Sequence, residues 1–310
     1  MRFVFMGTPA FAVPTLQKLV AAGHDCVGVW TQPDRPKGRG QQLAISPVKE
    51  AALKLGLEVR QPGRIRRPEQ VEALAALNAE IMVVVGYGQI IPQMIIDLPP
   101  YGIINVHASL LPKYRGAAPI QWAIANGETI TGVTTMKIDA GLDTGDMLLK
   151  AETAIDPDET AEQLSERLAI LGADLAVETL AQITRIVPEP QDHSQATWAP
   201  VLKREDGLID WNLSAGQIHN RARGFYPWPG AYTTFRGQRL HIWRSKPHSI
   251  SLGPPGATHI EGRRLMAACG SDTALEILDL QLEGRKRVSA EAFVNGHRLG
   301  PNEMLGEKTT

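Results

Sequence analysis

The stretch IINVHASLLPKYRG, residues 103–116, contains the side chains best suited to chemistry in this sequence. It begins as a hydrophobic strand and places Asn105 and His107 two residues apart. Because side chains alternate along a β-strand, residues i and i+2 point to the same side, so we expect this amide and this imidazole to face one place. A carboxamide can donate to a developing oxyanion, and an imidazole can move a proton near neutral pH. The pair therefore predicts a functional site on this strand.

A second polar segment, KIDAGLDTGD, places Asp139, Asp143 and Asp146 around two glycines directly after a strand. Its spacing does not match a calcium-binding EF-hand loop, which needs acids at alternating positions and a closing glutamate. An Asx-turn explains one of the aspartates. Glycines on both sides of Asp143 favour a loop that turns one carboxylate inward. There it would fix the tautomer of the His107 ring and support its protonated form.

No nucleophile accompanies these residues, because the GxSxG motif is absent and neither Cys26 nor Cys269 lies near them in the sequence. An amide donor, an acid/base and an orienting carboxylate suit the direct attack of one substrate on a carbonyl of another. The three residues alone leave a second interpretation open, in which His107 is a hydrogen-bonded histidine of the core.

The composition describes a globular protein of two domains, with 310 residues, 43% apolar and 21% charged. Two cysteines without a Cys/His cluster support neither a disulfide framework nor a structural zinc site, so we expect no metal and a reducing cytoplasm. The N-terminus MRFVFMGTPAFAV does not resemble a signal peptide, and no run approaches the ~20 apolar residues of a membrane span. We therefore expect a cytoplasmic protein that does not enter the membrane.

Short β-branched runs alternate with helical patterns over the first 150 residues, which predicts βαβ units on a parallel sheet. Gly7 follows the first strand, but the GxGxxG fingerprint and the Walker lysine are absent, which disfavours a nucleotide cofactor and leaves a structural turn or an anion site. From about Arg185 the segment RIVPEPQDHSQATWAPVLKREDG contains three prolines and few aliphatic residues. This composition predicts an extended linker, residues 189–206, between a first domain, 1–188, and a second, 207–310. Short strands in the second domain predict a small barrel or sandwich.

The two parts of the chain differ in charge. Residues 1–202 carry 17 basic and 22 acidic side chains, whereas residues 203–310 carry 15 and 11. A basic C-terminal part is typical of a protein that binds nucleic acid, although scattered surface charge explains it equally well.

The motif NVHASLLPKYRGAAPIQWAI, followed by MKIDAGLDTGDML, resembles the folate-dependent formyltransferases, whose signature pairs N-x-H with SLLPxYRG and an aspartate in DxGxDTG. The resemblance covers nearly the whole chain and is strongest to the members of the family that formylate methionyl-tRNA. It includes the segments TQPDRPKGRG, SPVK and WNLSAGQIHNRARGFYPWPGA. The resemblance implies an α/β fold, with a mostly parallel, Rossmann-like catalytic domain and a small OB-like β-barrel that binds tRNA.

The resemblance also implies the substrates and their residues. The formyl donor is 10-formyltetrahydrofolate as co-substrate, and the acceptor is the α-amino group of methionine on initiator Met-tRNA, with no covalent enzyme intermediate. We expect a monomer. The catalytic residues of the family fall on Asn105, His107 and Asp143, and its folate-contacting segment falls on Ser109, Leu110, Leu111 and Pro112.

A glycine-rich basic loop, TQPDRPKGRGQQ, contains Arg35, Lys37 and Arg39. By itself it is explained as a solvated loop. With the resemblance it corresponds to the mobile element that enters the tRNA acceptor stem, and Arg39 matches the arginine between its glycines. Such contacts to phosphate position the RNA and weaken with salt.

The second domain offers further candidates for contact with tRNA phosphates, although each is also explained as a solvated surface charge. These are Arg221, Arg223, Arg239, Arg244 and Lys246. Four aromatic residues could stack on bases, but aromatics beside prolines fit the core of the domain better. They are Trp211, Phe225, Tyr226 and Trp228.

Three other functions compete with this interpretation. A formyltransferase acting on a small amine and a formyltetrahydrofolate hydrolase would share Asn105, His107 and Asp143. Neither would need the basic loop together with a basic second domain. A nucleic-acid-binding module on an inactive Rossmann-like scaffold would need the basic elements but not the three polar residues.

Overall fold

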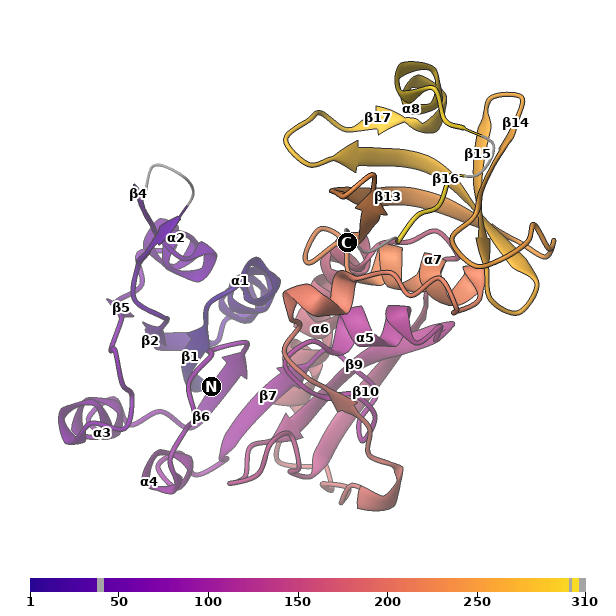
Figure 1. Cartoon of the computed structure of the whole chain (residues 1–310). Helices are drawn as coiled ribbons and strands as arrows, with labels where there is room; N and C mark the ends of the chain where they lie inside the picture. The colour runs from indigo at the N-terminus through magenta and orange to yellow at the C-terminus, as the bar shows by residue number, and fades with distance from the viewer. Residues whose placement is uncertain (38–41, 301–302, 307–310) are drawn as a thin grey trace. The chain divides into compact units, whose positions relative to one another are not determined.

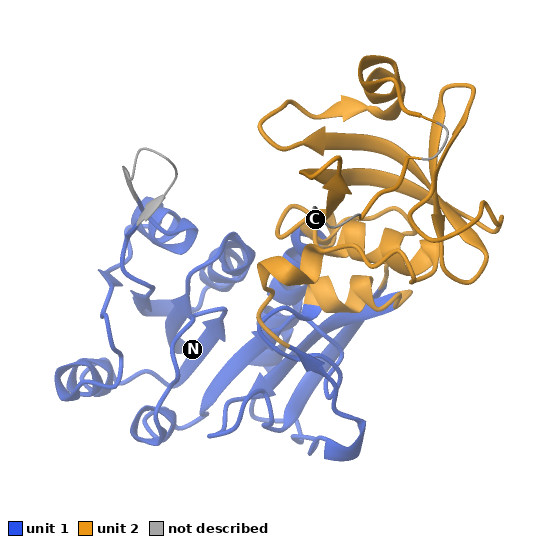
Figure 2. Ribbon diagram, viewed as in Figure 1, with its two compact units in different colours: residues 1–119, 130–153, 165–199 blue, residues 120–129, 154–164, 200–310 orange. Residues whose placement is uncertain are grey.

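The computed structural model describes residues 1–37, 42–300 and 303–306 (Figure 1). The chain divides into two compact units that are interleaved along the sequence (Figure 2). Unit 1 comprises residues 1–119, 130–153 and 165–199, and unit 2 comprises residues 120–129, 154–164 and 200–310. The first part of the expected linker, through Ala199, therefore belongs to unit 1. Among the described residues, none of the helices combines the length and apolar character that crossing a membrane requires.

The strands that lie wholly or mainly in unit 1 are β1 (Arg2–Gly7), β2 (Asp25–Trp30), β3 (Arg35–Lys37), β4 (Gln42–Ala44), β5 (Val59–Arg60), β6 (Ile81–Val85), β7 (Ile103–His107), β8 (Arg115–Gly116), β9 (Ile130–Lys137), β10 (Met147–Ala154) and β11 (Trp198–Ala199). Its helices are η1 (Ala10–Ala12), α1 (Val13–Ala21), α2 (Pro47–Lys54), α3 (Pro68–Ala75), α4 (Gln93–Ile96) and η2 (His193–Gln195). Residues of both units contribute to α5 (Pro119–Ala125) and α6 (Ala161–Gln182). Unit 2 contains η3 (Arg204–Gly207), α7 (Ala215–Gly224), β12 (Ala231–Phe235), β13 (Gln238–His248), β14 (Thr258–Glu261), β15 (Arg264–Cys269), β16 (Thr273–Leu282), β17 (Val288–Ser289) and α8 (Ala290–His297).

The sheet of unit 1 has the strand order β10-β9-β7-β6-β1-β2-β5. The pairs from β7 to β5 are parallel, and β9 pairs antiparallel with β7. The predicted parallel α/β sheet is confirmed. The chain builds one side of the sheet from β1 outwards and then returns to β6 on the other side. Open sheets of this kind bind ligands beyond the carboxyl ends of the strands, next to this reversal point.

Local sequence signals determine where α2 begins. The Ser46 hydroxyl accepts a hydrogen bond from the Lys49 N–H, and Pro47 follows at the first position of α2, where its missing N–H costs nothing. Further along the chain, α6 packs closely on β7 at Gly172. A Cβ atom at Gly172 would lie 2.9 Å from a methyl group of Val106, so the missing side chain lets α6 approach β7 closely.

The sheet of unit 2 has the order β12-β13-β16-β15-β14, with β17 paired to β16. Neighbouring strands of this sheet are antiparallel. The segment AYTTFRGQRLHIW forms a hairpin of β12 and β13. Its two turn residues, Arg236 and Gly237, have φ angles of 45° and 75°, which matches the right-handed twist of the strands. The predicted fold class is therefore confirmed, with a mostly parallel α/β sheet and a small antiparallel β-sheet.

The side chain of Glu276 on β16 lies between Arg264 of β15 and His248 of β13. Arg264 donates to both carboxylate oxygens at 2.9 Å, and His248 Nε2 lies 2.8 Å from Oε2. These hydrogen bonds, chiefly those from Arg264, lower the pKa of Glu276 from 4.5 to about 2. A lowered pKa means that the ionised carboxylate stabilises the fold above about pH 4.5, and that this contribution disappears as the pH falls towards 2.

We therefore expect Glu276→Gln to lower the free energy of unfolding at neutral pH and to flatten its dependence on pH in the acid range. Urea denaturation followed by circular dichroism, at neutral pH and at a series of acid pH values, measures both effects. The matched control is Glu261→Gln, because the Glu261 side chain is 78% exposed and lies 3.3 Å from Arg264. A loss of stability that is as large near pH 2 as at neutral pH would contradict the assignment.

Candidate active site

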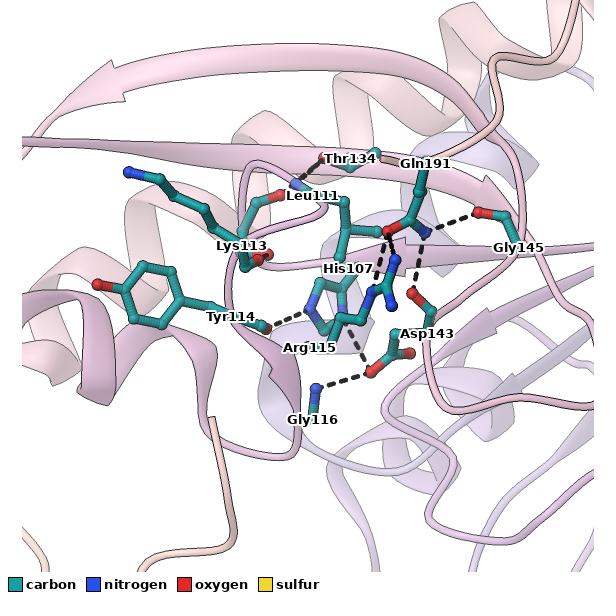
Figure 3. A network of polar contacts seen from close by, with 11 residues as sticks. His107, Leu111, Lys113, Tyr114, Arg115, Gly116, Thr134, Asp143, Gly145 and Gln191 are labelled. Carbon is teal, nitrogen blue, oxygen red and sulfur yellow. Dashed lines mark hydrogen bonds and ion pairs between the residues drawn. The ribbon is translucent and has the colours of Figure 1, made fainter. Parts of the chain in front are cut away.

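His107 lies at the carboxyl end of β7 and is only 6% exposed. Its Nε2 lies 2.9 Å from the carbonyl oxygen of Tyr114, and its Nδ1 lies 3.8 Å from Oδ2 of Asp143 (Figure 3). A carbonyl oxygen only accepts hydrogen bonds, so Nε2 must carry a hydrogen and Nδ1 is the nitrogen that can gain or lose one. The sequence predicts that Asp143 fixes the tautomer of His107. In the structure, the hydrogen bond that Nε2 donates to the Tyr114 carbonyl oxygen fixes it.

Asp143 lies in the loop between β9 and β10, and its side chain is 16% exposed. Its Oδ2 accepts a hydrogen bond of 2.9 Å from the backbone N–H of Gly116, so the atom that faces His107 is itself held in place. The Asx-turn of this segment is made by another residue, Asp139. Its Oδ1 accepts from the Gly141 N–H at 3.0 Å and from the Thr144 hydroxyl at 2.7 Å. The two interpretations of the acidic segment therefore apply to different aspartates.

The glycines on either side of Asp143 allow neighbouring atoms of the chain to lie very close to the loop backbone. Asp143 itself adopts the left-handed conformation, with a φ of 51°, which aspartate tolerates better than most residues. A Cβ atom at Gly145 would overlap the carbonyl oxygen of Lys137, and one at Gly141 would overlap the hydroxyl of Thr144. The loop can therefore fold tightly against β9, and its backbone directs the carboxylate.

Asn105 is half-buried on β7, where it is paired with Val84 of β6 and Met136 of β9. Asn105 and His107 lie on one strand, as predicted, and the period of two puts them on the same face. Within the described part of the chain, no hydrogen bond engages the Asn105 carboxamide. Its N–H groups are therefore available to a substrate.

The turn after β7 contains the four residues expected to contact folate. The Ser109 hydroxyl donates within this turn, its carbonyl oxygen accepts from the Thr134 hydroxyl, and Thr134 in turn accepts from the Leu111 N–H. Ser109 and Leu111 are buried, whereas Leu110 and Pro112 are half-buried. Ser109 and Leu111 therefore shape the turn, whereas Leu110 and Pro112 expose surface that a ligand can contact.

Sequence reasoning missed Gln191, which lies in the segment expected to be a linker. It is 6% exposed, and its Nε2 donates to the carbonyl oxygens of Asp143 at 2.9 Å and Gly145 at 2.7 Å. Its Oε1 accepts from Nε and Nη2 of Arg115, at 3.0 and 2.6 Å. Arg115 belongs to the YRG part of the sequence motif, but the sequence contains no signal that joins it to a glutamine 76 residues later.

The basic loop is described only in part. Arg35 is exposed on β3, and the backbone of Lys37 ends the same strand. Arg39 lies outside the described residues, so its expected role stays a prediction.

Arg223 of α7 differs from the other candidates for RNA contact because it is only 8% exposed. Its Nη1 donates to the carbonyl oxygens of Asp156 and Glu159, at 3.1 Å each, and burial lowers the pKa of its guanidinium. These contacts give Arg223 a role within unit 2 and leave little of it accessible to phosphate. Arg221, on the same helix, is half-buried.

The remaining candidates lie on β13. Arg239 is half-buried and stacks over the ring of Tyr232, with 4.7 Å to the centroid. Arg244 is exposed and lies 3.3 Å from a carboxylate oxygen of Asp279. Lys246 is exposed, and no ion pair engages it among the residues described. Arg244 and Lys246 are thus the most accessible of these cations.

The aromatic candidates divide between the core and the surface. Trp211 and Phe225 are buried, in agreement with a role in the core of the domain. Tyr226 is half-buried and packs edge-on against Trp243. Trp228 is 56% exposed and is the member of this set that a base could reach.

The two cysteines are poor nucleophiles. Burial raises the pKa of Cys26 to about 11 and that of Cys269 to about 12, so the reactive thiolate form is scarce at neutral pH. In the residues that the structure describes, no group of histidine, cysteine or carboxylate side chains has an arrangement that could hold a metal ion.

Comparison with solved structures finds proteins of similar fold. The N-formyltransferase from Helicobacter canadensis, solved with folinic acid and dTDP-3-aminofucose, is similar with a TM-score of 0.68 at 18% identity, over 89% of this chain and 98% of that one. HypX from Aquifex aeolicus is similar with a TM-score of 0.62 at 16% identity, over 96% of this chain and 47% of that one. At these identities the likeness shows the fold alone.

Sequence similarity to known proteins covers nearly the whole chain. Residues 1–180 match the formyl transferase family and residues 201–298 match the formyl transferase C-terminal domain. The methionyl-tRNA formyltransferase of Solibacter usitatus is 65% identical, over 99% of each chain. That of Koribacter versatilis is 59% identical, also over 99% of each chain. The predicted resemblance is confirmed, and the chain belongs to the methionyl-tRNA formyltransferase family.

Proposed function

We propose that this protein transfers the formyl group of 10-formyltetrahydrofolate to the α-amino group of methionine on initiator Met-tRNA. The observation that carries the proposal is the position of Asn105, His107 and Asp143 in a chain of this family. None of the described residues engages the Asn105 carboxamide, and His107 faces the Asp143 carboxylate at 3.8 Å. The amine attacks the formyl carbon directly, and no enzyme side chain becomes covalently attached. The product is formylmethionyl-tRNA, which serves translation initiation.

The chemistry of the substrates defines the tasks of the site. A free α-amine has a pKa near ~7.7 to 8.0, and an ester in place of the carboxylate lowers it further, so much of the nucleophile is neutral at cellular pH. The harder steps are alignment of two large substrates, stabilisation of the tetrahedral oxyanion and delivery of a proton to the departing folate nitrogen.

Asn105 and His107 divide these tasks. The Asn105 N–H groups donate to the formyl oxygen as it gains negative charge. His107 takes the proton that the attacking amine loses and assists its delivery to the folate nitrogen as the carbon–nitrogen bond breaks. Nδ1 of His107 faces Oδ2 of Asp143, so a proton on Nδ1 turns this contact into an ion pair. Asp143 therefore stabilises the form of His107 that carries the proton.

The surfaces for the two substrates follow from exposure and charge. Leu110 and Pro112 are the candidates for folate contact, because they are the more exposed residues of the turn after β7. For the tRNA we propose contacts with phosphate from Arg35, Lys37 and Arg39 of the basic loop. Arg221, Arg239, Arg244 and Lys246 are the candidates of unit 2. Arg223 is left out because its guanidinium is engaged inside the unit.

The experiment that tests the function is formyl transfer from 10-formyltetrahydrofolate to charged initiator Met-tRNA. Parallel reactions contain uncharged tRNA, elongator Met-tRNA, a small amine or no acceptor. We expect transfer only to the charged initiator tRNA. Release of formate without an acceptor would instead identify a hydrolase, and transfer to the small amine would identify a different acceptor.

We expect Arg39→Ala to raise the KM for tRNA about tenfold, because a hydrogen bond to a charged group contributes about 1.5 kcal/mol or more, and to leave the KM for folate nearly unchanged. The dependence of the KM for tRNA on salt should also fall by about one unit of slope, as for the loss of one phosphate contact. Steady-state kinetics at several salt concentrations measure both. The control is Arg64→Ala, which removes an exposed arginine elsewhere in unit 1. An unchanged KM for tRNA would exclude Arg39 from binding.

A further inference from the structure

We propose that Gln191 is a positioning residue of the active site, which holds the Asp143 loop against His107, and that Arg115 orients Gln191. The inference rests on the proposed function for its kinetic test. The hydrogen bonds of Gln191 join backbone atoms of the Asp143 loop to the side chain of Arg115, so its role is to set geometry.

Gln191 uses all the hydrogen-bonding capacity of its side chain at this one place. A glutamine amide has two N–H donors and an oxygen with two acceptor positions. The donors bind the carbonyl oxygens of Asp143 and Gly145, and the oxygen accepts twice from Arg115. A rotation of the amide would break all four bonds in a buried environment. The charged Arg115 donors strengthen this arrangement, because they can bind only the oxygen end of the amide.

Arg115 lies in the chain between two residues whose backbone groups belong to the site. The Tyr114 carbonyl oxygen accepts from His107, and the Gly116 N–H donates to Asp143 (Figure 3). The Arg115 side chain, between them, binds the glutamine that holds the Asp143 loop. The pair Arg115 and Gln191 therefore joins the two segments that set the separation of 3.8 Å between His107 and Asp143.

The chain around Gln191 is anchored on both sides. Glu189 and Met147 exchange two backbone hydrogen bonds of 2.8 Å, which fix the segment to the start of β10. Further along, β11 pairs in parallel with β8, the strand that contains Arg115. Gln191 is thus held between the two segments that it connects, and a small change in its side chain acts directly on the Asp143 loop.

The central variant is Gln191→Glu. It keeps oxygen atoms that accept from Arg115 and loses both N–H donors to the Asp143 loop. We expect kcat for formyl transfer to fall about tenfold, since small misplacements of reacting groups reduce rates strongly, while the KM values for both substrates change less than about twofold. Gln191→Met, of similar length, is expected to show the same split between kcat and KM. The control is Gln195→Met in η2, an exposed glutamine of the same segment, which is expected to keep the kcat of the wild type.

A double-mutant cycle with Asp143→Asn tests whether Gln191 acts through Asp143. If it does, adding Gln191→Glu to Asp143→Asn lowers kcat far less than the single change lowers it in the wild type. If the double variant loses kcat by the product of the two single losses, the proposal is overturned. It is also overturned if the Gln191→Glu variant has the kcat of the wild type.

A second measurement does not depend on formyl transfer. The Gly116 N–H donates to Asp143, so its amide hydrogen exchange reports whether the carboxylate is still in place. We expect Gln191→Glu to speed exchange at Gly116 about tenfold and to leave exchange at Val106, inside β7, unchanged as a control for the fold. Unchanged exchange at Gly116 would overturn the positioning role. A wild-type protein that transfers no formyl group would refute the proposed function and leave this test in force.

Discussion

We expect the Asn105→Ala variant to transfer the formyl group about 10²- to 10³-fold more slowly than the wild type, because it lacks the donor for the developing oxyanion. Its affinity for 10-formyltetrahydrofolate should change little, because the ground-state formyl oxygen carries only a partial charge and gains less from the same hydrogen bond. Single-turnover rates with both substrates saturating measure the first quantity, and equilibrium binding of a folate analogue measures the second.

The matched variant is Asn105→Asp, which keeps the size of the side chain and replaces its N–H groups by an oxygen. We expect it to be at least as slow as the alanine variant, because the carboxylate repels the oxyanion. If both variants lose folate affinity by the same factor as they lose turnover, Asn105 serves binding in the ground state and the oxyanion role is wrong.

The second large effect is expected for His107→Gln. A glutamine can place its amide nitrogen near the position of Nε2 and keep the hydrogen bond to the Tyr114 carbonyl oxygen, but it cannot take up a proton. General acid and base catalysis typically contributes about 10²- to 10⁴-fold, so we expect a loss of this order in kcat with modest changes in either KM. Steady-state kinetics, with circular dichroism as a check on folding, provide the measurement.

Asp143→Asn separates two roles that the structure gives to this carboxylate. Its Oδ2 accepts from the Gly116 N–H, which an asparagine oxygen can also do, and it faces Nδ1 of His107, where only a negative charge forms an ion pair. If charge matters, we expect Asp143→Asn to approach the loss of His107→Gln. An asparagine variant with nearly full activity would mean that Asp143 serves to hold the loop alone.

The sequence by itself determines the features whose signals are local. The alternation of strands and helices predicts the parallel sheet. Ser46 before Pro47, and Ser214 three residues before Gln217, are capping patterns at the start of α2 and α7. The period of two along a strand puts Asn105 and His107 on one face of β7. These features involve residues within one turn of helix or a few strand positions, so residue type and spacing are sufficient to recognise them.

Other features required the tertiary structure. Tyr114 orients His107 through a backbone carbonyl oxygen, which every residue type possesses, so no side-chain pattern marks it. Arg223 is one basic residue among several in α7 and β13, and only its burial shows that its guanidinium is engaged within the unit.

The clearest case is Gln191, in a proline-rich segment whose composition predicts an extended linker. It is 48 residues from Asp143 in the sequence, yet it binds the Asp143 and Gly145 carbonyl oxygens because β10 and α6 bring the chain back to the same loop. The sequence alone therefore predicts which side chains do the chemistry. The tertiary structure decided what holds them in place, because hydrogen bonds to backbone atoms depend on where the folded chain passes and leave no periodic pattern in the sequence.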